Sequence, residues 1–131
     1  MIETTAIDRW IESYLTAWDS DAPDDIAALF APNARYFTAP FRTPYTGVDE
    51  IVRFWVENGD SEIPWAFECD VIAREGDLYV IRGATTYPDG GDVAGEKTEV
   101  YSNLWLVTLD SEGRATEFVE YWMEDNTAES A

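Results

Sequence analysis

The sequence predicts an α+β domain in which three helices from the N-terminal half pack on the concave face of a cone-shaped, highly curved, mostly antiparallel sheet. Two patterns support the α+β class, and the cone is a geometric inference from a curved sheet with helices on its concave side. Apolar residues recur every three or four positions in segments of the first half, and they alternate with polar residues in segments of the second half. Elements segregated in this way are typical of α+β domains. The 131 residues, 46% of them hydrophobic, suit one domain with its own core.

Helical spacing predicts helices over residues 4–19, 24–30 and 48–58. The apolar stripe of the first helix consists of Ile7, Ile11, Tyr14, Leu15 and Trp18. Pro23 suits the start of the second helix, and Gly59 suits the end of the third.

Strand patterns predict one strand at residues 34–39, before the third helix, and a loop over residues 40–47. Four further strands are predicted at residues 65–72, 78–87, 98–109 and 115–123. Short turns between them favour an antiparallel meander. We therefore expect a single domain over residues 1–123 and a polar tail over residues 124–131.

The chain is strongly acidic, with 27 acidic and 8 basic residues and a formal net charge of -19. This charge disfavours nucleic acid and anionic membranes as partners. The acidity is explained either by solubility, including solubility in a high-salt cell, or by attraction of a cationic partner. The sequence shows neither an apolar run of about 18 residues nor a basic and apolar leader, so we expect a cytoplasmic protein.

The chain contains no histidine. This excludes Ser-His-Asp and Cys-His catalysis as well as histidine-ligated metals. Neither a calcium-loop spacing nor a glycine-rich phosphate loop is visible, so we expect no metal and no cofactor. The single cysteine, Cys69, excludes an intramolecular disulfide and is expected to be an inert core thiol.

Three stretches carry a family resemblance: Ile-Ala-Ala-Leu-Phe-Ala-Pro-Asn-Ala at 26–34, Tyr-Thr-Gly-Val-Asp-Glu-Ile-Val-Arg-Phe-Trp at 45–55, and the run from Tyr-Ser-Asn-Leu-Trp to Glu-Tyr-Trp at 101–122. Over residues 5–123 the chain resembles SnoaL-like proteins of the nuclear transport factor 2-like superfamily. The resemblance implies a cone cavity for a small hydrophobic or aromatic molecule and a homodimer formed through the sheet face. Ketosteroid isomerase, limonene epoxide hydrolase, scytalone dehydratase and polyketide cyclases belong to this superfamily, as do non-catalytic binding proteins.

The catalytic patterns of these relatives match only in part. Ketosteroid isomerase-like chemistry needs a carboxylate base near the end of the first strand, with a tyrosine and a protonated acid as its oxyanion hole. Tyr14 stands at the tyrosine position, but Thr38 and Ala39 stand at the base position, and residues 101–103 offer no acid. Cyclase and dehydratase relatives use His-Asp pairs, which this chain cannot form.

Glu120 is the sharpest catalytic candidate, because it lies between Phe118 and Trp122 on one face of the last strand. Burial in an apolar pocket would raise its pKa and make it a general acid or base, with Tyr14 assisting. The alternative is a surface carboxylate paired with an arginine, either Arg82 or Arg35.

The predicted ligand-binding residues are aromatic side chains and one amide: Trp18, Tyr36, Trp55, Trp65, Tyr101, Asn103, Trp105 and Trp122. Aromatic residues line ligand pockets, but they also fill cores and interfaces. Three functions therefore stay open: an enzyme that transfers a proton through Glu120, a non-catalytic ligand-binding module, and a dimeric structural module with a vestigial pocket.

Overall fold

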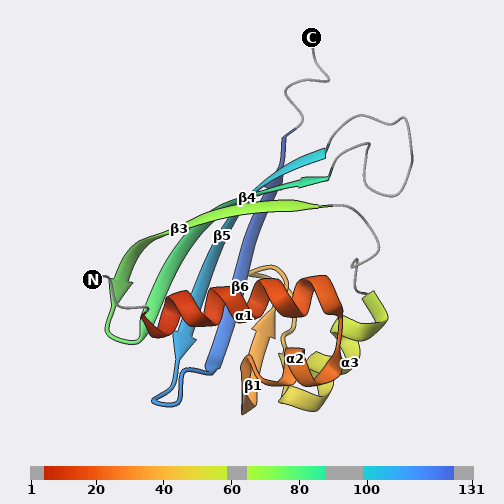
Figure 1. Cartoon of the computed structure of the whole chain (residues 1–131), viewed down its shortest axis with the longest axis vertical. Coiled ribbons are helices and arrows are strands. Elements are labelled where there is room, and N and C mark those ends of the chain that lie inside the picture. Colours follow the sequence, from red (N-terminus) through yellow and green to blue (C-terminus); the bar gives the residue numbers. More distant parts are fainter. Residues whose placement is uncertain (1–4, 59–64, 88–98, 126–131) are drawn as a thin grey trace.

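A computed structural model describes residues 5–58, 65–87 and 99–125, and within them three helices accompany one six-stranded sheet (Figure 1). The helices are α1 (Ala6–Ser20), α2 (Pro23–Ala27) and α3 (Val48–Asn58). The strands are β1 (Phe30–Phe37), β2 (Tyr45–Thr46), β3 (Ala66–Glu75), β4 (Leu78–Tyr87), β5 (Glu99–Leu109) and β6 (Ala115–Glu124). The predicted α+β class is confirmed.

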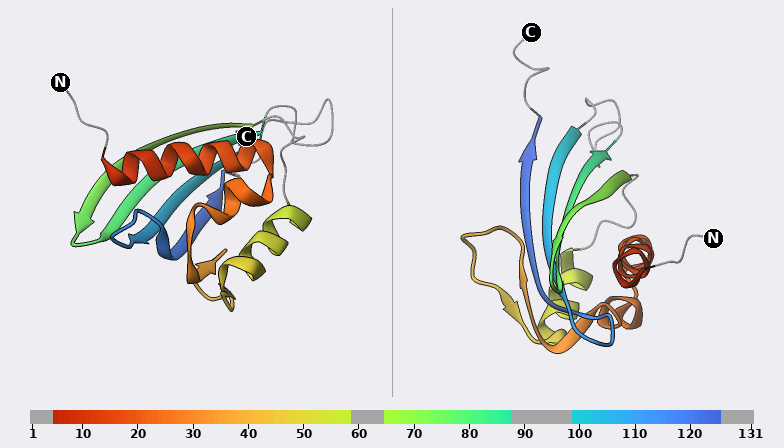
Figure 2. Two further views of the ribbon diagram at one scale, coloured as in Figure 1. Left: turned by 60° about the horizontal axis from the view of Figure 1, so that its bottom comes forward. Right: turned by 90° about the vertical axis from the view of Figure 1, so that its left-hand side faces the viewer.

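The sheet has the order β2-β1-β6-β5-β4-β3, and the four strands from β3 to β6 form the predicted antiparallel meander. β1 pairs in parallel with β6, and β2 pairs antiparallel with β1. The long strands curve, and α1 lies across their concave side (Figure 2). The concave space beneath α1 is therefore where a cavity can form.

Helix α1 begins at a capping box, in which the Thr5 hydroxyl accepts from the Asp8 backbone N–H and the Asp8 side chain reaches back to Thr5. Its buried residues are Ile7, Trp10, Tyr14 and Ala17, whereas Ile11, Leu15 and Trp18 are only partly buried. The predicted stripe therefore missed Trp10, and the true contact line runs along the 7, 10, 14, 17 positions.

The first strand begins earlier than predicted and shortens the second helix. Phe30 starts β1, because it pairs with Ala115 of β6, so α2 ends at Ala27 instead of reaching residue 30. Two residues of the predicted loop 40–47 form β2, and Tyr45 pairs there with Tyr36. The third helix is confirmed at Val48–Asn58.

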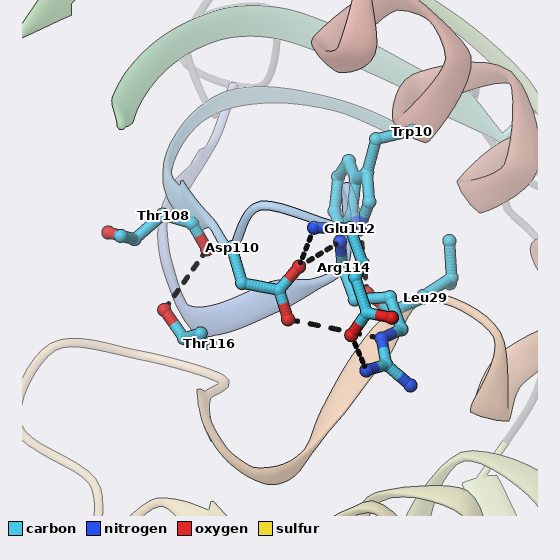
Figure 3. A network of polar contacts seen from close by, with 7 residues as sticks. All are labelled: Trp10, Leu29, Thr108, Asp110, Glu112, Arg114 and Thr116. Atoms are coloured by element: carbon cyan, nitrogen blue, oxygen red, sulfur yellow. Dashed lines mark hydrogen bonds and ion pairs between the residues drawn. The ribbon is translucent and has the colours of Figure 1, made fainter. Parts of the chain in front are cut away.

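A network of polar contacts closes the turn between β5 and β6 (Figure 3). Asp110 Oδ1 accepts from the backbone N–H groups of Glu112 and Arg114 at 2.9 and 3.0 Å. The Arg114 side chain donates to Glu112 Oε2 at 2.6 Å. Beside the turn, Trp10 Nε1 donates to the Leu29 carbonyl at 2.9 Å and fixes α1 against this end of the sheet.

The predicted domain boundary falls inside the last strand, because β6 continues to Glu124. Residues 126–131 of the predicted tail lie outside the described residues. Among the helices of the described part, none is long and apolar enough to cross a membrane.

Candidate functional site

Two adjoining cavities lie between α1 and the sheet, and they share the side chains of Tyr14, Trp18 and Glu120. The first, of about 220 Å³, is called the aromatic cavity here; its other lining residues are Thr85, Tyr87, Tyr101, Asn103, Trp105 and Trp122. The second, of about 250 Å³, is also lined by Tyr36, Thr38, Phe54, Trp55 and Asn58. A larger hollow of about 590 Å³ lies over α3 and β2, but none of the predicted site residues lines it.

The strand register brings the polar groups of the aromatic cavity together. Asn103 of β5 lies opposite Trp122 of β6, and Trp105 lies opposite Glu120. On the other side of β5, Asn103 lies opposite Gly83 of β4. Because residues two apart along a strand share one face, all four side chains of β5 and β6 point to the concave side.

A chain of hydrogen bonds ends on the Glu120 carboxylate. The Thr85 hydroxyl donates to Asn103 Oδ1 at 2.8 Å, and Asn103 Nδ2 donates to Glu120 Oε2 at 2.7 Å. Trp105 Nε1 donates to the same oxygen at 3.3 Å. Thr85 therefore orients the amide so that its NH₂ group faces the carboxylate. Among the described residues, no hydrogen-bond donor reaches the second carboxylate oxygen, Oε1.

Burial raises the pKa of Glu120 above its ordinary value, and the hydrogen bonds from Asn103 and Trp105 offset only part of this effect. In the part of the chain that the structure describes, neither arginine nor lysine lines the two cavities. Arg35 forms its ion pair with Glu117, and Arg82 contributes to a hollow on the opposite face of the sheet. Glu120 is thus paired with neither arginine that the sequence offered as an alternative.

The predicted aromatic residues occupy different places around the two cavities. Tyr36 and Trp55 are buried and line the second cavity, whereas Trp122 is 50% exposed at the edge of the aromatic cavity. Trp65 lines neither of them. It stacks on Trp18 with ring centroids 4.1 Å apart and an interplanar angle of 10°, and so it supports a cavity wall from behind.

Sequence reasoning missed Thr85 and Tyr87, which line the aromatic cavity from β4. Both share the inward face of that strand with Ile81, so their spacing contained the signal. Only the pairing with β5 shows that Thr85 donates to Asn103 and that Tyr87 packs against Tyr101. Phe54 and Asn58 of α3 were missed in the same way, because the position of that helix was not predictable.

The carboxylate of this site comes from the last strand instead of the first. Thr38, at the ketosteroid isomerase-like base position, lines the second cavity without a carboxylate, and Ala39 lies at the hollow on the outer face. In the described part of the chain, no three His, Cys, Asp or Glu residues form a group that could hold a metal ion. Burial raises the pKa of the Cys69 thiol, which disfavours its reactive thiolate form.

The chain belongs to the SnoaL-like domain family, whose model matches residues 11–118. A comparison with curated proteins finds no match. Among solved structures, a ketosteroid isomerase-like protein from Erwinia carotovora atroseptica is 20% identical, with 90% of this chain and 94% of that chain covered and a TM-score of 0.62.

Two further structures share the fold. The protein RV0760c from Mycobacterium tuberculosis is 9% identical, with 95% of this chain and 100% of that chain covered and a TM-score of 0.74. A computationally designed 17-OHP binder is 12% identical, with 87% of this chain and 90% of that chain covered and a TM-score of 0.65. These likenesses support the cone fold predicted from the sequence.

Proposed function

We propose that the chain binds a small, mainly apolar or aromatic molecule in the aromatic cavity and that Glu120 exchanges a proton with it. The observation that carries this proposal is the Glu120 carboxylate. It combines a pKa raised by burial, a position in a cavity walled by aromatic rings, and an oxygen, Oε1, that no donor among the described residues reaches. A carboxyl group in such a setting is a typical general acid or base.

The surrounding residues have distinct parts in this proposal. Asn103 and Trp105 hold Oε2, so that Oε1 faces the bound molecule, and Thr85 keeps the amide of Asn103 in its donating orientation. Tyr14 and Trp18 form the wall shared by the two cavities. The similar designed protein is described as a 17-OHP binder, which supports small-molecule binding as a use of this fold.

Binding is tested by tryptophan fluorescence, because Trp18, Trp105 and Trp122 line the cavity. A panel of small aromatic and alicyclic compounds should quench or shift the emission at saturating concentrations, and Trp122→Ala should weaken the response. Val56→Ala, at an exposed position of α3, is the matched control and should bind as the unaltered protein does. Failure of the whole panel to change the emission would refute ligand binding at this site.

Proton transfer is tested with bound ketones in D₂O. We expect deuterium to enter the carbon next to the carbonyl, and Glu120→Gln should slow this exchange about 10²–10⁴-fold while binding persists. Equal rates of deuterium exchange in the two proteins would show that Glu120 does not transfer the proton.

A non-catalytic binding module is the second candidate. It is favoured by Thr38 and Ala39, which leave the base position of the ketosteroid isomerase-like pattern without a carboxylate. Binding of the panel without any deuterium exchange in the unaltered protein would select this candidate.

We also propose a homodimer formed through the outer face of the sheet. Tyr121 and Met123 of β6 are 43% and 73% exposed there, beside a hollow of about 520 Å³ that is lined in part by Arg82 and Leu104. The Arg82 side chain on this face reduces the repulsion between two acidic copies. Light scattering should give a dimer mass at micromolar concentration and a monomer mass for Met123→Asp. A monomer mass for the unaltered protein would refute the dimer.

A further inference from the structure

The charge of the aromatic cavity is unbalanced. Among the described residues, Glu120 is its one acidic lining residue, and no basic residue lines either cavity. Within the described ranges, the ion pairs join surface residues of β1, β6 and the β5–β6 turn, namely Arg35 with Glu117 and Arg114 with Glu112 and Asp110. A partly buried carboxylate without a cation loses hydration that hydrogen bonds restore only in part. A positively charged ligand would supply the missing charge.

The walls of the cavity form an aromatic cage. The rings of Tyr87 and Tyr101 meet at 85° with centroids 5.9 Å apart, and the rings of Tyr101 and Trp122 meet at 68° with centroids 6.1 Å apart. On the α1 side of the cavity, the rings of Tyr14 and Trp18 meet at 84°. Rings at such steep angles surround a space instead of closing it by stacking. The negative faces of aromatic rings attract cations whose centres lie within about 6 Å.

The Glu120 carboxylate lies next to this cage. Glu120 and Trp122 are two residues apart on the same face of β6, a separation of roughly 6.6 Å along the strand. A cation between them would contact the Trp122 ring and the open Oε1 oxygen together. The cavity volume of about 220 Å³ is below the roughly 300–1,000 Å³ of sites for drug-sized ligands, so it suits a compact head group.

Other classes of ligand satisfy these features less well. An anion would be repelled by Glu120 and by a chain of net charge -19. A neutral apolar molecule would fill the cage but leave the carboxylate uncompensated. A bare metal ion needs several oxygen or nitrogen ligands, and the described residues provide no such group.

We propose that the aromatic cavity selects organic ammonium cations attached to an aliphatic or aromatic body, with the ammonium group between Glu120 and the rings of Tyr101 and Trp122. This inference rests on the ligand-binding part of the proposed function and is independent of proton transfer. It also gives the acidity of the chain a role, because a strongly negative surface raises the local concentration of cations.

The test uses pairs of probes that share their shape and differ in charge. Choline is compared with 3,3-dimethylbutan-1-ol, and benzyltrimethylammonium is compared with neopentylbenzene, by tryptophan fluorescence at constant ionic strength. We expect each cation to bind at least about tenfold more tightly than its neutral counterpart, a difference of about 1.4 kcal/mol. Glu120→Gln should reduce this preference to about threefold or less while the neutral probes bind as before.

Glu117→Gln is the matched control, because it also removes one negative charge from β6 but at a residue that pairs with Arg35 outside the cavity. The control should keep the preference for the cation. An equal loss of preference in both variants would assign the effect to overall charge and overturn the site.

The outcomes separate this inference from the proposed function. If neutral probes bind as tightly as the cations, charge selection is wrong and small-molecule binding stands. If neither the cations nor the neutral panel bind, both proposals are wrong.

Discussion

The two ends of the β5–β6 hairpin are built from the same strands and differ sharply in what they bury. Near the turn, Val107 and Phe118 are fully buried and Leu109 is 4% exposed, in an apolar core beneath α1. Two residues farther along the same face of β6, Glu120 lines a cavity with Asn103. The apolar core thus gives way to a cavity within one step along the strand.

The carboxylates of the hairpin show the same contrast. At the turn, backbone hydrogen bonds, above all from Arg114, lower the pKa of Asp110. In the cavity, burial raises the pKa of Glu120. Backbone hydrogen bonds therefore favour the anion of Asp110, whereas burial disfavours the anion of Glu120.

The largest effect is expected at the core end. Phe118→Ala should lower the free energy of unfolding by about 3–5 kcal/mol, because the fully buried ring contacts the rings of Trp10, Tyr14, Tyr36 and Trp105. Urea unfolding followed by circular dichroism measures the change. Trp122→Ala, which removes a half-exposed ring on the same strand face, should lower it by less than about 1 kcal/mol. Similar losses of unfolding free energy in the two variants would show that the core end and the cavity end of the hairpin contribute equally to stability.

The next largest effect is expected at Gly83, where the cavity end meets β3. A Cβ atom there would lie 2.6 Å from Phe67 Cζ and 3.0 Å from the Glu68 carbonyl oxygen. Phe67 stacks on Trp105 at 13°, so it has little freedom to move aside. Gly83→Ala should therefore cost about 1–3 kcal/mol in urea unfolding.

Shortening the neighbour provides the check on this explanation. The double variant Gly83→Ala with Phe67→Leu should lose less unfolding free energy than the sum of the losses in the two single variants. The reason is that the clash with the Phe67 ring is removed. Strict additivity would mean that Phe67 does not limit the space at Gly83.

Most of the fold was predictable from local patterns, because the meander strands alternate clearly and α3 has a strong apolar face. The parts that were not predictable depend on pairing between distant segments. Phe30 belongs to β1 because it meets Ala115, and Tyr45 belongs to β2 because it meets Tyr36. Neither contact leaves a signal in the adjacent sequence.

Part of the candidate site was predictable as single residues, but their arrangement was not. Its aromatic composition and the flanking of Glu120 by Phe118 and Trp122 suggested a pocket with one acid. The donation from Asn103 to Glu120 and the contribution of Thr85 follow from the alignment of three strands, which periodicity does not fix.

Glu120→Gln is expected to have a smaller effect on stability, and this effect is a gain instead of a loss. The raised pKa means that the unaltered protein is most stable while Glu120 is protonated and loses stability as the pH rises through that pKa. The glutamine carbonyl can still accept from Asn103 and Trp105 without a charge. We therefore expect a melting temperature about 3 °C higher than that of the unaltered protein at pH 8 and equal to it at pH 4, by calorimetry. Destabilisation at pH 8 would show that the fold favours the anion.

The smallest effect is expected at the turn, where Asp110→Asn reverses the sign of that pH dependence. The lowered pKa of Asp110 means that its anion adds stability at neutral pH, and this contribution disappears as the pH falls through that pKa, below its ordinary value of 3.8. Asparagine keeps an acceptor for the Glu112 and Arg114 N–H groups but lacks the charge. Because the turn is partly exposed, we expect a loss of only about 0.5 kcal/mol at pH 7.

Urea unfolding of this variant and of the unaltered protein at pH 7 and pH 3 measures the effect, and the two curves should approach each other at pH 3. Together with Glu120→Gln, this gives two variants of one hairpin whose stability differences shrink on acidification from opposite directions. Suppose that both variants differ from the unaltered protein in stability with the same sign at neutral pH. The two ends of the hairpin would then have the same effect on their carboxylates, and the proposed division into a stabilising end and a binding end would be wrong.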